Sequence, residues 1–324
     1  MSETIDREAL ARVIAMINGK GGVLKTSTTQ NVGGQLAEQG MKILLIDTDI
    51  SGNLKIGLGL VGSPDDDAGK SIVDAVWNGQ PFKIARDVRP NLDIIFGGRA
   101  LEMLGKLAQS SMADDLPNGS VAAEFAARLS EIAGEYDLVI IDCPPGNAEL
   151  QDMALAAARW VLIPAKTDEM SWEGLRGVGP RVKRARRDNE TLDYLGVFLT
   201  GHNPTATRVY KNTQVRLEEV GDKVPLLRST IRHSETAAHD TTTRGQLAHE
   251  LARDVKAQRA SRLQALRARR DDAHGSSAPL KAPALSQTAN SLADDYKHLA
   301  AEVCERITAA EEAEASEQLE GARA

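Results

Sequence analysis

Two lysines and a threonine lie close together in the stretch INGKGGVLKTST, residues 17–28. The pattern G-x-x-x-x-G-K-[ST] defines a loop that binds nucleotide phosphates. Gly19, Lys25 and Thr26 match this pattern, whereas Leu24 replaces its second glycine and Lys20 adds a further cation. The stretch therefore predicts phosphate binding, with one substitution whose effect depends on the backbone conformation.

A loop of this kind holds phosphates mainly with backbone N–H groups. Gly21 and Gly22 allow a tight turn that directs successive N–H groups at a phosphate chain, and a following helix adds the positive end of its dipole. Lys25 supplies a cation for the outer phosphates, and Thr26 a hydroxyl for Mg²⁺. The expected nucleotide-binding residues are Gly19, Lys20, Gly21, Gly22, Val23, Leu24, Lys25, Thr26 and Ser27.

Three aspartates follow apolar runs that are typical of buried strands. Asp47 and Asp49 occur in ILLIDTDISGN, and Asp142 in YDLVIIDCPPG. Open α/β sheets bind their ligands at the carboxyl ends of the strands. A single aspartate there often only caps a loop, but three beside a phosphate loop favour a site for Mg²⁺ and an attacking water.

The elements that must position these residues alternate along the chain. Apolar runs at 12–17, 42–47, 92–97, 136–142, 160–165 and 194–200 predict strands that are covered on both faces. Segments with helical spacing, such as STTQNVGGQLAEQG, separate them. This alternation predicts an α/β fold, with a doubly wound and mainly parallel sheet flanked by helices. The pattern leaves the order of the strands open.

The C-terminal part of the chain has a different composition. An Ala/Arg-rich helical pattern is followed by a segment rich in Pro, Ser and Ala, then by a last amphipathic helix and acidic residues. We expect a P-loop domain over 1–245 and a basic helical extension with a flexible connector over 246–290. A terminal helix over 291–307 is expected to pack on the P-loop domain, and the acidic tail, 308–324, to be disordered.

Composition narrows the class of protein. Cys143 and Cys304 are the only cysteines, far apart in the sequence, which argues against a disulfide framework or a zinc site and favours a reducing cytoplasm. The sequence has no secretory signal at its start and no apolar run of the roughly 18 residues that a membrane span needs. The net charge is −7, but stretches 181–187 and 253–270 are strongly basic. The stretch 181–187 could contact nucleic acid, or it could equally be a solvated helix face.

Together these motifs resemble the deviant Walker ATPases of the ParA/MinD type. NGKGGVLKTS is similar to the family's KGGxGKT loop, and its distinctive early lysine falls on Lys20. LLIDTDISGN resembles the motif DxDPQGN, and YDLVIIDCPPG resembles the Walker B segment. VLIPAKTDEMSWEGL (161–175) and STIRHSETAAH (229–239) are similar to the family's VPxxxExxxxxGL and VRxSEAPS segments. The resemblance runs from about Arg12 to His239, and the last helix resembles the family's terminal Y-x-x-L-A-x-E-V.

The resemblance implies roles for individual residues. Lys20 corresponds to the signature lysine that reaches across a nucleotide-sandwich dimer to the partner's phosphates, and Asp49 to the residue that orients the hydrolytic water. These two are the expected catalytic residues. Thr26 would bind Mg²⁺ directly, while Asp47 and Asp142 would hold the ion through its waters. ATP and Mg²⁺ are the implied cofactors, and a homodimer with ATP is the implied assembly.

Leu24 departs from the family pattern. If its position needs a left-handed backbone, a leucine there costs roughly 1–2 kcal/mol. We therefore expect ATP binding or hydrolysis to be weaker than is usual in the family. Ile50 and Ser51 replace the family's Pro-Gln, which leaves the geometry after Asp49 open.

Simple features separate the branches of the family. Iron–sulfur members would need paired cysteines, and a membrane-bound MinD-like member would end in a basic amphipathic helix, whereas this sequence ends in acidic residues. The resemblance thus implies a cytoplasmic, nucleoid-associated partitioning ATPase with no membrane partner. Its dimer would bind duplex DNA non-specifically and respond to a ParB-like centromere-binding protein. Two alternatives stay open: a MinD-like surface-positioning ATPase, and a nucleotide-gated scaffold that binds ATP without appreciable hydrolysis.

Basic residues are the candidate DNA contacts. Arg232 lies in the segment that matches the family's DNA-facing region, and Arg208 is a second candidate. In the basic extension, Arg259, Arg262 and Arg267 could contact DNA, or could pair with the acidic tail or a partner protein.

Overall fold

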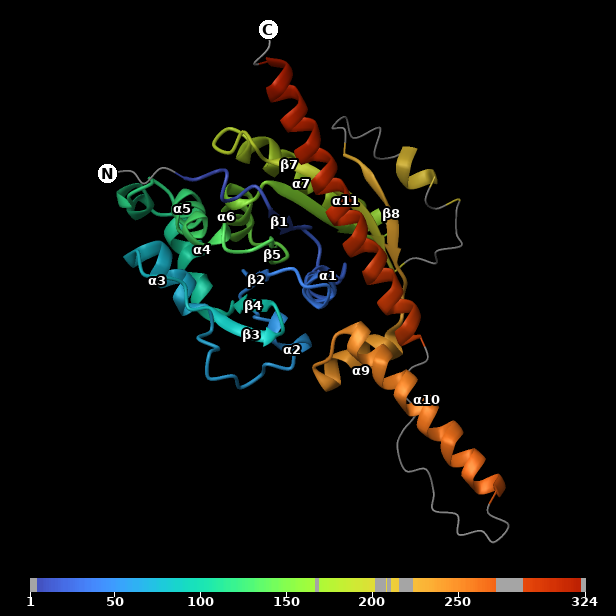
Figure 1. Ribbon diagram of the computed structural model, residues 1–324. Helices are drawn as coiled ribbons and strands as arrows, with labels where there is room; N and C mark the ends of the chain where they lie inside the picture. Colours follow the sequence, from blue (N-terminus) through green and yellow to red (C-terminus); the bar gives the residue numbers. More distant parts are fainter. Residues whose placement is uncertain are drawn as a thin grey trace.

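A central sheet organises the chain. The computed structural model describes residues 5–166, 169–201, 208, 211–215, 224–271 and 288–321, and within them an eight-stranded sheet (Figure 1). The strands are β1 (Val13–Met16), β2 (Ile43–Asp47), β3 (Ala85–Arg89), β4 (Leu92–Ile95), β5 (Leu138–Asp142), β6 (Trp160–Ala165), β7 (Asp193–Thr200) and β8 (Leu226–Ile231). Their order is β3-β4-β2-β5-β1-β6-β7-β8, and every pair is parallel except the antiparallel β3 and β4. The predicted doubly wound, mainly parallel sheet is confirmed.

Side chains of the central strands alternate between two hydrophobic cores, one on each face of the sheet. Val13 and Ala15 of β1 belong to the first core, whereas Ile14 and Met16 belong to the second. Successive residues of a strand point to opposite faces, so the near-continuous apolar runs in the sequence supply both cores at once.

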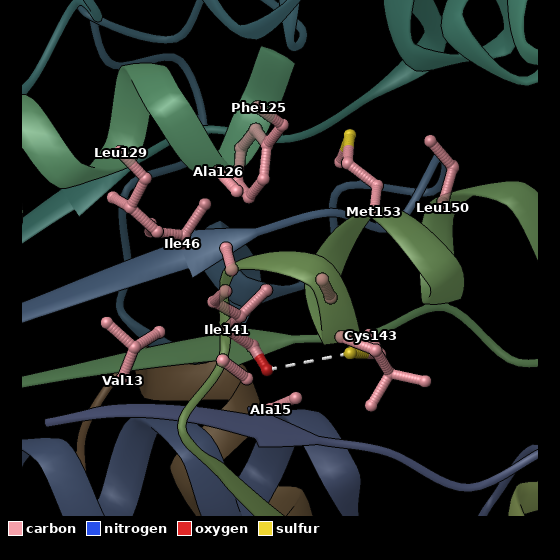
Figure 2. Close-up of a cluster of buried hydrophobic side chains, with 14 of the residues drawn as sticks. Val13, Ala15, Ile46, Phe125, Ala126, Leu129, Ile141, Cys143, Leu150 and Met153 are labelled. Atoms are coloured by element: carbon pink, nitrogen blue, oxygen red, sulfur yellow. Dashed lines mark hydrogen bonds between the residues drawn. The ribbon is translucent and has the colours of Figure 1, made fainter. Parts of the chain in front are cut away.

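Helices cover both faces. The first core is closed by α3 (Lys70–Asn78), α4 (Glu102–Ala108), α5 (Val121–Ala133), α6 (Ala148–Ala157) and α7 (Glu169–Ala185), with the short helices η1 (Arg99–Leu101) and η2 (Ser111–Asp115) between them. Figure 2 shows Phe125 of α5 and Met153 of α6 packed over Ile46 and Ile141 of the sheet. The second core is closed by α1 (Lys25–Glu38), α2 (Leu54–Gly57), α9 (Glu235–Arg244), α10 (Ala248–Asp271) and α11 (Ala289–Gly321).

Two strands were not predicted from the sequence. The β3 segment, ARDVR, is largely polar and lies at one edge of the sheet, where Asp87 has a positive φ of 50°. The β8 segment, LLRSTI, forms the opposite edge. Edge strands bury less of their surface than central ones, so they lack the continuous apolar run by which buried strands are recognised.

The expectation of a disordered acidic tail is corrected up to Gly321. Helix α11 extends from Ala289 to Gly321, well beyond the predicted end at residue 307. The Arg12 guanidinium donates to both carboxylate oxygens of Glu311 at 2.7 and 2.9 Å, and Arg159 forms an ion pair with Glu314. These contacts from the sheet side hold the acidic part of the helix against the body of the protein.

Helices α10 and α11 leave the body at opposite ends. The first turns of α10 are packed, with Leu251 and Val255 buried, whereas Arg259 and Gln264 are exposed on the half that projects away (Figure 1). The C-terminal end of α11 lies at the far side of the molecule (Figure 1). The acidic end of α11 is therefore too distant to neutralise the projecting half of α10 in the same chain.

No helix among the described residues has both the length and the apolar character to span a membrane.

Candidate nucleotide site

Strand register brings the predicted site residues together. Asp142 of β5 is paired with Met16 on one side and with Asp47 on the other. The end of β1, where the phosphate loop begins, therefore lies beside both aspartates. The sequence placed these residues at strand ends, but only the order β2-β5-β1 makes them neighbours.

The phosphate loop connects β1 to α1, as the motif predicts. Gly22 has a φ of 72°, and Leu24, the residue that precedes α1, has φ 68° and ψ 25°. The position of Leu24 is therefore left-handed, the conformation for which the usual glycine carries no steric penalty. Its carbonyl accepts the first helical hydrogen bond, from Thr28 N–H at 2.8 Å, so the strained residue is part of the helix start.

Asn18, which was not among the predicted site residues, braces the loop. Its side chain is fully buried, donates to the Pro164 carbonyl at 2.8 Å and accepts from Lys20 N–H at 2.9 Å. Lys25 folds back over the loop, and its ammonium donates to the Lys20 carbonyl at 2.8 Å. The loop is thus held from β6 and from within before any phosphate binds.

Two carboxylates lie buried under the loop. Asp47 and Asp142 are each about 1 % exposed. Burial, and then the neighbouring Asp142, raise the pKa of Asp47 well above its usual range, and burial raises the pKa of Asp142 to about 7. Burial also lowers the pKa of Lys25. The two carboxyl groups therefore resist ionisation in the empty site, and a bound divalent cation would favour their ionised forms.

Hydroxyl groups fix the orientation of Asp142. Thr26 donates to its Oδ2 at 2.6 Å, Thr29 to its Oδ1 at 3.5 Å, and Thr48 to its carbonyl at 2.8 Å. Asp47 accepts instead from the backbone N–H groups of Asp49 (2.9 Å) and Leu54 (3.1 Å). Thr29 and Thr48 carry no motif signal, and only the packing of α1 and β2 on β5 shows their role.

Asp49 begins the segment that leads into α2. Its Oδ1 accepts from the Ser51 N–H at 2.9 Å and from the Ser51 hydroxyl at 2.6 Å. Ser51, which departs from the resembled motif, therefore caps the turn after Asp49 and settles the geometry that the sequence left open.

An open cleft of about 380 Å³ lies over the loop. It is lined by Gly21, Gly22, Leu24, Lys25, Thr26, Ser27, Gln30, Asp49, Asn53, Ile56, Gly57, Pro145 and Thr242. Val23 turns inward and is buried, while its carbonyl accepts from the Thr200 hydroxyl at 3.3 Å. Gly19 lies against Gly174 of α7, whose backbone is also close to Lys20.

The residues fit a magnesium ion held partly by other groups. Among the described residues, no three His, Cys, Asp or Glu side chains converge as a complete metal cage. Mg²⁺ in phosphate sites takes one or two protein oxygens and completes its shell with phosphate oxygens and waters. The Thr26 hydroxyl and the two buried carboxylates can supply this small number of protein oxygens.

Comparison with known proteins agrees with this geometry. A family model described as an AAA domain matches residues 11–194. The chromosome-partitioning ATPase Soj of Treponema pallidum is 28 % identical over 262 residues, which cover 76 % of this chain and 98 % of Soj. The chromosome partitioning protein ParA of Caulobacter vibrioides is 31 % identical over 265 residues, 75 % of this chain and 93 % of ParA. This chain belongs to the ParA/MinD-type P-loop ATPases.

A solved structure of similar fold is the ATP complex of a McdA variant from Cyanothece, with a TM-score of 0.60 and 23 % identity over 74 % of this chain and 90 % of that one. At this identity the likeness concerns the fold alone. Membership of an ATPase family assigns ATPase activity in general terms to the chain.

Within this ParA/MinD-type chain, the predicted DNA contacts come from three parts of the sequence: Arg208, Arg232 just after β8, and three arginines of α10. Arg232, just after β8, makes two side-chain hydrogen bonds to Asp295 of α11, at 2.6 and 2.7 Å. Arg208 and Arg259 are exposed, and Arg262 is half-buried with an interaction of its own. Arg267 belongs to α10, but its side chain lies outside the described residues.

The basic run at the end of α7 is largely paired. Arg181 and Arg184 both contact Asp152, at 3.2 and 3.7 Å, and Arg186 contacts Asp193 at 2.5 Å. Of the two interpretations of this run, the pairing favours an ordinary solvated helix face.

Proposed function

We propose that this chain is an ATP-dependent DNA-partitioning ATPase, cytoplasmic and associated with the nucleoid. It binds ATP with Mg²⁺ and dimerises in the ATP-bound state. The dimer binds duplex DNA non-specifically, and hydrolysis, stimulated by a ParB-like centromere-binding protein, releases it. Similarity to the partitioning proteins Soj and ParA supports this branch of the family.

The observation that carries the ATPase part is the contact between Thr26 and Asp142 beneath the phosphate loop. Their 2.6 Å hydrogen bond places the hydroxyl ligand and a buried carboxylate of the proposed metal site side by side. Mg²⁺, when bound, would neutralise charge on the phosphates and polarise them toward attack. Thr26 would hold the ion directly, with Asp47 and Asp142 acting through its waters.

The remaining chemistry falls to three side chains. Lys25, whose ammonium donates to the Lys20 carbonyl, would bind the outer phosphates. Asp49 lines the cleft and would orient the attacking water in line with the γ-phosphate. Lys20 would contact the phosphates bound by the partner copy and stabilise the charge that develops on the transferred phosphoryl group.

The DNA part rests on basic residues outside the cleft. Backbone phosphates attract arginines without regard to sequence, and the attraction weakens steeply with salt. Arg208, Arg232, Arg259, Arg262 and Arg267 are the proposed contacts. The exposed side chain of Arg259 on α10 supports the idea, because its charge is accessible to DNA phosphates.

The deciding experiment is binding of random-sequence duplex DNA, followed by fluorescence anisotropy. The protein is tested without nucleotide, with Mg·ADP and with Mg·ATP, and Lys20→Ala runs alongside. We expect tight, salt-sensitive binding only with ATP, and its loss in the variant. Equal binding in all three states, or binding in none, would contradict the proposed nucleotide switch.

A second function is favoured by one observation, the left-handed backbone at Leu24. If the resulting strain prevents the loop from reaching its catalytic geometry, the chain would be a scaffold that binds ATP and does not hydrolyse it. Single-turnover hydrolysis with excess protein separates the two functions. If the protein binds ATP but no hydrolysis is detected in a single turnover, the result would favour the scaffold.

A further inference from the structure

A short segment connects the phosphate site to the base of helix α10. This segment, residues 49–59, begins at Asp49 in the cleft, includes α2 and ends at Gly59. Gly59 lies beside Gly245, the first of the three residues between α9 and α10. Figure 1 shows α2 next to α9, at the point from which α10 projects. The nucleotide cleft and the basic helix thus share one connecting element.

The first contact of this segment is with α1. Gln30 is only 6 % exposed and lines the cleft, and its amide packs against Gly57 of α2. A Cβ on Gly57 would lie 2.0 Å from the Gln30 Oε1. That oxygen is buried and has no hydrogen-bond partner among the described residues. A buried acceptor without a hydrogen-bond partner costs free energy. A rearrangement of α2 that lets Gln30 gain a partner when the cleft fills would therefore be favoured.

The second contact joins two backbones directly. Gly59 and Gly245 both have positive φ, 69° and 61°. A Cβ built on Gly245 would lie 2.2 Å from the Gly59 Cα, and one built on Gly59 would lie 2.9 Å from the Gly245 carbonyl oxygen. Because neither residue has a side chain that could rearrange, movement of one backbone toward the other must displace it.

Gly245 is in turn tied to the first turn of α10. Arg89 donates to the Gly245 carbonyl at 3.0 Å and to Glu250 of α10 at 2.6 Å. The Ala248 N–H donates to Asn31 of α1 at 2.7 Å. A shift of the backbone at Gly245 would therefore change the position of the first turn of α10. The projecting half of this helix would then move with its first turn.

From these contacts we infer that segment 49–59 transmits the nucleotide state of the cleft to α10, so that nucleotide binding in the cleft beside Asp49 changes the direction of the basic helix. The inference rests on the proposed nucleotide binding, and it adds the route by which the site controls a distant surface. From residue 248 to residue 264 the helix rises about 24 Å. A tilt of about 10° at Gly245 would thus move the exposed half by about 4 Å.

The test measures the position of α10 directly. Nitroxide labels are placed on Gln264→Cys of α10 and Lys183→Cys of α7, both exposed sites, and Cys304→Ser removes the partly exposed native thiol. Double electron–electron resonance then gives the distance without nucleotide, with Mg·ADP and with a non-hydrolysable ATP analogue in the presence of magnesium. Excess unlabelled protein removes distances between chains, and nucleotide affinity is measured on the same samples.

The matched pair of variants is Gly245→Ala and Gly62→Ala. Gly62 also has a positive φ, 81°, but a Cβ there would meet nothing within 4 Å. Both variants therefore carry the same backbone strain, and only the first disturbs the contact with Gly59. Gln30→Ala removes the contact of α1 with Gly57 at the other end of the segment. It replaces Gly245→Ala in the test if that variant does not fold.

We expect the distance to shift by several ångströms between the ADP state and the ATP-analogue state. Gly245→Ala or Gln30→Ala should lose most of this shift, and Gly62→Ala should keep it. Gly245→Ala and Gly62→Ala, which lie outside the lining of the cleft, should retain nucleotide affinity within about threefold. An unchanged distance in a wild-type protein that binds the analogue would overturn the coupling. A normal shift in Gly245→Ala, or equal loss in Gly62→Ala, would do the same. Failure to bind any nucleotide would refute the proposed function itself, and the coupling with it.

Discussion

Asp47 and Asp142 lie directly opposite each other in the register of β2 and β5, and both are almost completely buried. Two carboxylates in such a place destabilise the empty protein, because burial and mutual repulsion both oppose ionisation. This destabilisation is offset when a bound cation neutralises the two carboxylates. Stability without a ligand and function with one are therefore expected to conflict at this pair.

The first prediction concerns Asp142→Asn. An asparagine can still accept from the Thr26 hydroxyl, but it removes a buried charge, so the melting temperature in EDTA should rise while ATP hydrolysis is lost. The pKa of Asp142 in the folded protein, about 7, lies above its unfolded value, so the wild type loses stability as the pH rises toward 7. The gain in the variant should thus be large at pH 8 and small at pH 5, as measured by thermal melts. An equal gain at both values would contradict the assigned cause.

The second prediction concerns the left-handed residue at the start of α1. Leu24→Gly should relieve roughly 1–2 kcal/mol of backbone strain and raise nucleotide affinity or turnover by up to about tenfold. Leu24→Ala is the control, because it removes most of the side chain but keeps the Cβ that causes the strain. Calorimetric binding of ATP and steady-state hydrolysis would measure both effects. If the alanine variant gains as much as the glycine variant, the side chain and not the backbone is responsible.

A third prediction tests whether the Asp295 carboxylate restrains Arg232. If Arg232 contacts DNA, Asp295→Asn should free its guanidinium, tighten DNA binding and steepen the salt dependence by up to about 0.9 in log–log slope. Glu305→Gln is the matched control, since it neutralises an acid on the same helix whose partner is Arg228, 2.9 Å away. Fluorescence anisotropy across a salt series gives both quantities. Equal effects of the two variants would point to overall charge and not to Arg232.

The fourth prediction concerns the edge of the sheet. Glu302 of α11 is 4 % exposed and accepts from the backbone N–H groups of Arg228 (2.9 Å) and Ser229 (2.8 Å), which leaves the edge strand β8 capped by a side chain. In Glu302→Gln, the side-chain NH₂ group would face one of these N–H donors and could not accept its hydrogen bond. The variant should therefore lose about 1–3 kcal/mol of unfolding free energy. Chemical denaturation at neutral pH measures this cost.

The pH dependence of that cost provides its control. Burial raises the pKa of Glu302, but the hydrogen bonds from Arg228 and Ser229, together with the charge of Arg306, outweigh burial, and the net pKa lies below the ordinary value of 4.5. A lowered pKa means that the contribution is present above that value and is lost as the pH falls through the folded pKa. The difference between wild type and variant should therefore shrink at acid pH. A constant difference would show that packing alone is affected.

Much of the fold and the site follows from local sequence. Six apolar runs predicted the six strands that lie inside the sheet, because a strand buried on both faces must be apolar along its length. Gly21, Gly22, Lys25 and Thr26 identified the phosphate loop, because that chemistry is confined to adjacent residues. By itself, the sequence determined the fold class and the family, and it predicted the residues of the site.

Only the tertiary structure decided what depends on residues far apart in the chain. The order β2-β5-β1 brings Asp47 to Asp142, and Asn18 finds the Pro164 carbonyl only because β6 lies beside β1. Arg12 and Arg159, each just before a strand of the sheet, form ion pairs with the acidic part of helix α11. The contact of Gly59 with Gly245 leaves no trace in composition or spacing. Each of these is set by how elements pack in space, and packing is a property that no local pattern encodes.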